Sequence, residues 1–171
     1  NSKAVCELLV VELLYLWVCI PFCDQAHLTK ILEICDQIND KNYMHLKCLF
    51  EGVVHMNSNN ADFAEQCINE SIARAENSKL SFGKYVLPCA HYELSTYHTD
   101  QNDLPTAKGY LSKARDNFKD YELENRIQTQ IKSLQKRIKH FQDTPMLKAR
   151  AEQDAELLAK KQNETKNFYM N

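Results

Sequence analysis

A short pattern of small and large apolar residues in the C-terminal half of the chain constrains its fold most. Ala107, Leu111 and Ala114 are spaced four and three positions apart, so on a helix they share one face. The small residues let a second helix approach closely, and the leucine between them fills the remaining gap. The pattern therefore predicts a pair of closely packed helices.

The same landmarks occur in an earlier segment of the sequence. In each copy a small residue is followed twelve positions later by a second one, then by a large apolar residue and a third small one. Because the copies begin at residues 52 and 95, the repeat is 43 positions long. We expect the first small residue to face the second across a helical hairpin. The copies are Gly52, Ala64, Ile68 and Ser71, and Ser95, Ala107, Leu111 and Ala114.

This arrangement resembles the tetratricopeptide repeat (TPR), in which helical hairpins of about 34 residues stack side by side. We expect the additional length to lie in a loop at 78–83. The aromatic residue of the usual signature is absent, because Cys48 and His91 occupy its place. The resemblance implies an all-α fold of TPR-like antiparallel helical hairpins that form a right-handed superhelix, followed by a C-terminal helical tail.

Longer stretches of the sequence resemble one family more specifically. They are L-Y-L-W-V-C from Leu14, L-F-E-G-V-V from Leu49, H-Y-E-L from His91 and the run Y-L-S-K-A-R-D-N-F-K-D-Y-E-L-E-N-R-I from Tyr110. Together they resemble the C-terminal part of the tetratricopeptide repeat protein 39 family, which is related to fungal inclusion-body clearance proteins. The resemblance covers 4–141, and the sequence departs from the family pattern after Arg126.

The resemblance implies a non-enzymatic scaffold or adaptor for protein–protein interaction, linked to lipid homeostasis or inclusion clearance and mostly cytosolic. Two other interpretations remain open. One is a membrane-associated protein with its first helix in or on the bilayer. The other is a structural cap that closes a longer repeat array.

The composition also favours helices, since only three glycines and four prolines occur in 171 residues. The chain begins without methionine, inside an apolar run, so we expect a fragment of a longer protein. Residues 1–141 are predicted to form the repeat domain, and 142–171 a charged helical or partly disordered tail. The expected helices are 4–20, 25–38, 42–56, 61–77, 85–99, one after Asp103, 121–141 and 144–163.

Local signals mark several of these helices. Asp24, Asn60 and Asp103 are expected to cap helices, because their side chains can accept hydrogen bonds from backbone N–H groups. Gly109 lies inside a predicted helix, where glycine costs about 1 kcal/mol relative to alanine. We therefore expect a close helix contact at Gly109 that requires a small residue.

The first predicted helix, 4–20, is apolar nearly all round. Its 17 residues reach only the lower limit for a membrane span. Glu7 and Glu12 lie inside it, and carboxylates are costly in lipid. A buried core helix is the expectation, and a membrane segment is the less favoured alternative.

The first helix of each hairpin lines the concave groove in TPR arrays. The expected groove has one apolar and one mildly polar half, without the basic and amide residues that grip a terminal carboxylate. We predict that it binds an amphipathic or apolar helix of a protein partner. The alternative is that another part of the same chain fills it, because large bare apolar stripes are rare on protein surfaces. The predicted groove residues are Leu46, Leu49, Val53, Met56, Cys89, Tyr92, Thr96 and Thr99.

Charge and cysteine content limit the other classes of function. The net charge of −2 provides no field for nucleic acid or for an acidic membrane. The seven cysteines are odd in number and contain no C-x-x-C, so we expect reduced thiols in a reducing compartment. This favours the cytoplasm, with the periphery of an organelle membrane as a variant. Lys132, Lys136 and Lys139 share one helix side, which we interpret as a solvated face and alternatively as a surface for an acidic partner or for phospholipid.

Catalytic and metal-binding signatures are absent from the sequence. His91 and His98 are seven positions apart, or about 10 Å along a helix, which is too far for joint coordination of one ion. We therefore expect no enzyme activity, no cofactor, no metal and no small-molecule substrate.

Overall fold

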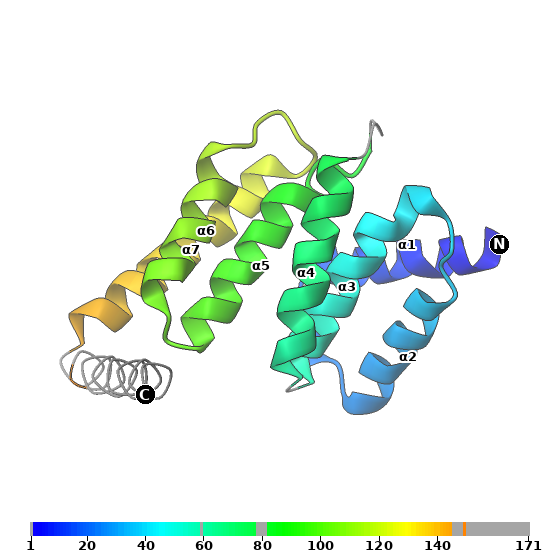
Figure 1. The fold of residues 1–171 in the computed structure, drawn as a ribbon, viewed down its shortest axis with the longest axis horizontal. Helices are drawn as coiled ribbons and strands as arrows, with labels where there is room; N and C mark the ends of the chain where they lie inside the picture. Colours follow the sequence, from blue (N-terminus) through cyan, green and yellow to red (C-terminus); the bar gives the residue numbers. More distant parts are fainter. Residues whose placement is uncertain (1, 59, 78–81, 145–148, 150–171) are drawn as a thin grey trace, which may run out of the picture.

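The computed structural model describes residues 2–58, 60–77, 82–144 and 149, and within these ranges every regular element is helical (Figure 1). The all-α expectation is therefore confirmed for the described residues. Two short 3-10 helices, η1 (Ile20–Phe22) and η2 (Lys41–Tyr43), precede α2 and α3. The α-helices are α1 (Ser2–Leu16), α2 (Gln25–Asp36), α3 (Met44–Asn57), α4 (Ala61–Glu76), α5 (Val86–Asp100), α6 (Leu104–Asp116) and α7 (Glu124–Asp143).

Helices α3 and α4, and likewise α5 and α6, form closely packed pairs. A Cβ atom built on Gly52 in α3 would lie 2.4 Å from Ile68 Cγ1 and 3.1 Å from the Ala64 carbonyl oxygen in α4. In the second pair, the Ser95 hydroxyl donates a hydrogen bond of 2.8 Å to the Ala107 carbonyl oxygen. The prediction that small residues face each other across each pair is confirmed.

The remaining repeat landmarks are also buried. Ile68 and Leu111 are 0% and 4% exposed, and Ser71 and Ala114 are both fully buried. Ser71 donates a hydrogen bond of 2.7 Å to the His45 carbonyl oxygen at the start of α3. Three small positions per copy therefore set how closely the helices of each pair approach.

Helix α1 crosses behind α3 in Figure 1, and side chains of its C-terminal half bond to residues at α5. The Tyr15 ring packs on Phe50 of α3, with 5.5 Å between ring centroids. Its hydroxyl donates a hydrogen bond of 2.9 Å to Glu93 Oε1 in α5. The Tyr85 hydroxyl at the start of α5 donates in turn to the Glu12 carboxylate. Two tyrosine–carboxylate hydrogen bonds thus join α1 to α5.

The inner face of α1 belongs to the core and its outer face is apolar but exposed. Ala4, Leu8 and Val11 are at most 1% exposed. Val10 and Leu13 on the other side are 57% and 56% exposed. Among the helices of the described residues, each is too short or too polar to pass through a bilayer.

Helix α1 ends at Leu16, earlier than predicted, because the backbone turns at Val18. The φ angle of Val18 is +58°. The Val18 N–H donates to the Tyr15 carbonyl oxygen and the Cys19 N–H to the Leu14 carbonyl oxygen, the pair of hydrogen bonds that closes a helix C-terminus in a Schellman motif. The chain then forms η1 as a separate element.

Two predicted caps are confirmed and two local predictions are wrong. The Asp24 and Asp103 side chains accept hydrogen bonds from the backbone N–H groups of His27 and Thr106. Asn60 precedes α4, but its side chain makes no capping hydrogen bond.

Gly109 is exposed, and a Cβ built there meets no atom within 4 Å. The close contact expected at Gly109 is absent because α6 packs through its opposite face.

Helix α7 begins at Glu124, three residues later than predicted, because Asp120 and Leu123 adopt positive φ angles of 57° and 63°. The domain boundary expected at 141 falls inside α7. The tail predicted at 142–171 and its helix at 144–163 lie almost entirely outside the described residues.

The buried face of α7, which joins the same core as α1 to α6, consists of Ile127, Ile131, Leu134 and Ile138.

Candidate functional site

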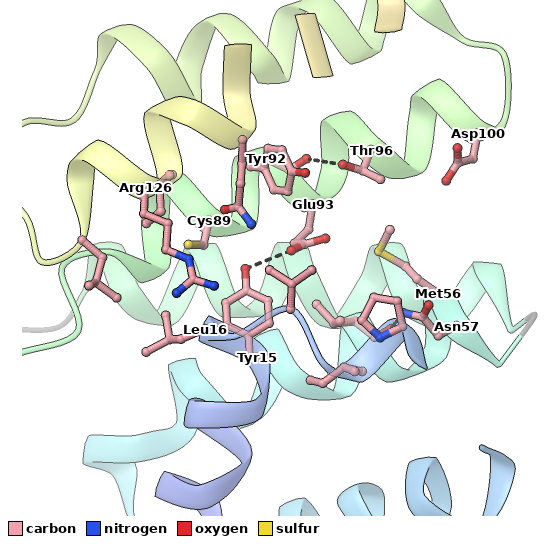
Figure 2. A pocket seen from close by; sticks show the side chains of 17 residues that line it. Tyr15, Leu16, Met56, Asn57, Cys89, Tyr92, Glu93, Thr96, Asp100 and Arg126 are labelled. Carbon is pink, nitrogen blue, oxygen red and sulfur yellow. Dashed lines mark hydrogen bonds between the residues drawn. The ribbon is translucent and has the colours of Figure 1, made fainter. Parts of the chain in front are cut away.

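A pocket of about 270 Å³ lies where α3, α5, the end of α1 and the start of α7 meet (Figure 2). Helices α3 and α5 are the first helices of the two matched pairs. The segment from the end of α1 to η1 supplies a second wall, and α7 supplies a third. The lining residues are Tyr15, Leu16, Val18, Ile20, Pro21, Val53, Met56, Asn57, Cys89, Tyr92, Glu93, Thr96, Asp100, Leu123, Arg126, Ile127 and Gln130.

The structure brings five of the eight predicted groove residues together in this pocket. They are Val53 and Met56 from α3, and Cys89, Tyr92 and Thr96 from α5. Of the predicted groove residues, they are the two nearest the C-terminal end of α3 and three of the four on α5.

The other three predicted groove residues are core residues. Leu46, Leu49 and Thr99 are at most 2% exposed, and the Thr99 hydroxyl donates to the Ser95 carbonyl oxygen at 2.6 Å. Leu46 and Leu49 belong to the same buried cluster as the inner face of α1. These three side chains do not line the pocket, so the accessible site is smaller than the predicted groove.

Glu93 supplies a carboxyl group to the site and is bonded to the end of α1. Its Oε1 atom accepts the hydrogen bond from Tyr15, whereas its Oε2 atom accepts none from the described residues. Burial raises the pKa of Glu93 to about 7, against the opposing effect of the Tyr15 hydrogen bond. The carboxyl group is therefore close to half ionised at neutral pH.

The apolar spacing did not predict Glu93 as a site residue, although the repeat contains a signal for it. Position 93 lies 43 residues after Phe50, so the two are equivalent in the repeat. Phe50 is fully buried, and its ring contacts Tyr15. Tyr15 thus contacts both equivalent positions, through its ring in one repeat and through its hydroxyl in the other. The signal is therefore a carboxyl group at position 93, where the equivalent position 50 carries a buried aromatic ring.

The neighbouring groups on α5 are protonated at neutral pH. Burial raises the pKa of the Cys89 thiol and of the Tyr92 hydroxyl, each to about 12. Since the thiolate is the reactive form of cysteine, Cys89 is a weak nucleophile here. The Thr96 hydroxyl donates to the Tyr92 carbonyl oxygen at 3.1 Å. This wall can donate and accept hydrogen bonds but is not activated for covalent chemistry.

The charged residues around the opening come from α5 and α7. Arg126 stacks its guanidinium group over the Trp17 ring, 5.3 Å from the centroid, and forms no ion pair with a described residue. Arg137 pairs with Asp100 at the far end of α5. The position of Arg126 beside α1 follows from packing that the sequence pattern does not reveal.

The histidines on α5 pack as rings. The Tyr110 ring of α6 stacks on His98 and on His91, with centroid distances of 5.4 Å and 5.9 Å. Among residues 2–58, 60–77 and 82–144, no group of three or more histidine, cysteine or acidic side chains is arranged to hold a metal ion. The seven cysteines are free, and three of them, Cys35, Cys48 and Cys89, are buried.

No family model matches this chain. No solved structure matches it either. The chemistry of the pocket and the repeated helix pairs are thus the observations from which a function can be argued.

Proposed function

We propose that the chain is a non-catalytic scaffold or adaptor that binds a protein partner at this pocket. Its helix pairs would form part of a TPR-like right-handed superhelix. The observation that carries the proposal is that the first helices of two successive matched pairs, α3 and α5, share one pocket. In helical-repeat proteins such first helices line the surface that holds the ligand.

The lining side chains support binding over catalysis. Apolar groups such as Val53, Met56 and Ile127 can desolvate a partner side chain, and Glu93 can orient it through a hydrogen bond. The Cys89 thiol stays protonated at neutral pH because burial raises its pKa. The family resemblance suggests a role in lipid homeostasis or inclusion clearance, in the cytoplasm or at the periphery of an organelle membrane.

A test is to compare partner capture by the wild type, Thr96→Arg and Thr129→Arg. Thr96 lines the pocket, so the arginine would fill it. Thr129 is exposed on α7 and, like Thr96, donates its hydroxyl to the carbonyl oxygen four residues earlier. Capture followed by mass spectrometry should lose a defined protein with Thr96→Arg and retain it with Thr129→Arg. Retention of every partner by both variants would contradict the proposal.

A second candidate is a membrane-associated protein, and the outer face of α1 favours it. Val10 and Leu13 are 57% and 56% exposed on this face, and Trp17, just after the end of α1, is 69% exposed. Such a face could lie on a bilayer surface. If the chain is instead a structural cap, the same face could pack against a further helix pair of a longer repeat array. Wild type that sediments with phosphatidylcholine vesicles, together with Leu13→Glu that does not, would favour the membrane candidate.

A further inference from the structure

The second carboxyl oxygen of Glu93, Oε2, is open to the pocket and available to a bound donor. Oε1 is occupied by the Tyr15 hydroxyl, and Oε2 has no partner among the described residues. Because burial disfavours the ionised form of Glu93, a cationic group that donates to Oε2 would stabilise the carboxylate. Figure 2 shows the Glu93 carboxyl beside the Tyr15 hydroxyl, among the side chains that line the pocket.

No ion pair with a described residue compensates the negative charge of Glu93. Arg126 stacks on Trp17, and Arg137 is paired with Asp100. Burial and the Tyr15 hydrogen bond alone account for the altered pKa of Glu93, so neither arginine contributes. The other titratable neighbours, Tyr15, Cys89 and Tyr92, are neutral at pH 7, and burial raises their pKa values further from neutrality. A cation is therefore the complementary ligand.

The shape and lining of the pocket restrict how that cation is carried. Small-molecule pockets usually measure about 300–1,000 Å³. At about 270 Å³ this pocket lies at the small end of that range and can hold one long side chain. Val53, Met56 and Ile127 offer apolar contact to an aliphatic stem, and the Tyr15 and Tyr92 rings can attract a cation.

The single free oxygen distinguishes between the two basic side chains. Arginine binds carboxylates best through two parallel hydrogen bonds, which require both oxygens. Tyr15 already occupies one of them. A lysine ammonium is a compact charge with rotatable donors and needs only one acceptor. The geometry therefore favours lysine over arginine.

We propose that the pocket accepts a lysine side chain of the partner protein, whose ammonium group donates to Glu93 Oε2 while its methylene chain lies between α3 and α7. This inference rests on the proposed function, since it names the anchor residue of that partner. The bound ammonium replaces water as the donor to the carboxylate. Its charge compensates for the cost of keeping Glu93 ionised in the interior.

The test uses N-acetyl-lysine methylamide as the probe and NMR of the methyl groups of Val53 and Met56 as the readout. The matched probes are N-acetyl-norleucine methylamide, which has the stem without the ammonium, and N-acetyl-arginine methylamide. At about pH 8 the lysine probe should bind at least tenfold more tightly than either. Equal binding of the norleucine probe would overturn the proposal.

Two further measurements make the same experiment specific for Glu93. Glu93→Gln should weaken lysine-probe binding at least tenfold, and Glu122→Gln, an exposed control, should leave it unchanged. In the wild type, affinity should rise about tenfold from pH 6 to pH 8, because a carboxyl group with a pKa of about 7 loses its proton over this range. The pH series decides the question even if Glu93→Gln does not fold. Binding that is independent of pH would contradict the role of Glu93.

The outcome also separates this inference from the proposed function. A partner that is lost with Thr96→Arg but retained with Glu93→Gln would leave the pocket as the binding site and remove lysine as its anchor. Partners that are all retained with Thr96→Arg would refute the proposed function itself.

Discussion

At the scale of single residues, the side chains that set helix spacing are the most sensitive to change. Gly52 approaches α4 so closely that a methyl group would have to displace Ile68 Cγ1 or the Ala64 carbonyl oxygen. Ser95 occupies the equivalent position and bonds to the opposing backbone. The cost of a substitution therefore depends on the facing helix more than on helix propensity.

Gly52→Ala and Gly109→Ala form a matched pair of substitutions that separates these two effects. Gly52→Ala should lower the free energy of unfolding by about 1–3 kcal/mol, because overpacking outweighs the propensity gain. Gly109→Ala should raise it by about 1 kcal/mol, since the added methyl group meets nothing within 4 Å. Urea denaturation measures both. Changes of the same sign would contradict the close contact at Gly52.

Glu93 predicts a pH dependence of stability that one substitution removes. Burial raises its pKa from 4.5 to about 7, so the folded state keeps a proton that the unfolded chain has lost between these values. Its contribution to stability is fully present below about pH 4.5 and is lost as the pH rises through about 7.

The stability of Glu93→Gln relative to the wild type should therefore increase by on the order of 3 kcal/mol between about pH 4.5 and 7.5, at about 1.4 kcal/mol per pKa unit. Burial lowers the pKa of His91 to about 4, which gives the opposite trend with pH in both proteins. Subtracting the wild-type urea-denaturation series from that of the variant cancels this effect. A difference that is constant with pH would show that Glu93 is not perturbed.

At the scale of helices, local sequence signals predict where elements lie better than where they end. The spacing of apolar residues located every helix from α1 to α7 to within a few residues. The ends of α1 and the start of α7 differ because Val18 and Leu123 adopt left-handed backbone angles, which are uncommon for such residues. At Val18 local backbone hydrogen bonds to Tyr15 and Leu14 close the helix, and the apolar spacing contains no mark of either angle.

Helix capping provides a test at this scale. Asp103→Ala should destabilise the protein by about 1 kcal/mol, because α6 loses the side-chain acceptor for the Thr106 N–H group. Asn60→Ala should cost only a few tenths, since Asn60 makes no capping hydrogen bond. Asp103→Asn keeps an acceptor and should retain most of the stability. Thermal unfolding followed by circular dichroism distinguishes them, and equal losses for Asp103→Ala and Asn60→Ala would argue against the cap.

At the scale of the whole molecule, one hydrophobic core runs from Ala4 in α1 to Ile138 in α7. The repeat pattern predicted the two central pairs and five of the pocket residues. It did not predict that α1 crosses α3 or that α7 supplies Arg126 and Ile127 to the pocket, because such contacts join segments far apart in sequence. The site was therefore only partly accessible to sequence reasoning.

A continuous core predicts cooperative unfolding. The chain has a single tryptophan, Trp17, at the end of α1 and against Arg126 of α7. Trp17 fluorescence should therefore follow the same urea transition as far-UV circular dichroism, which reports all helices. A fluorescence transition at lower urea would mean that α1 detaches first and that the core is not one unit.

The left-handed backbone at Leu123 has a consequence for how this protein could diversify. A leucine in this conformation costs about 1–2 kcal/mol, and it stands where α7 turns into the pocket wall. Glycine or asparagine at position 123 would remove most of this conformational cost and would hold α7 less firmly in its orientation. A single substitution at position 123 could thus change the shape of the pocket opening and the ligand that it admits, while the carboxyl group of Glu93 stays in place.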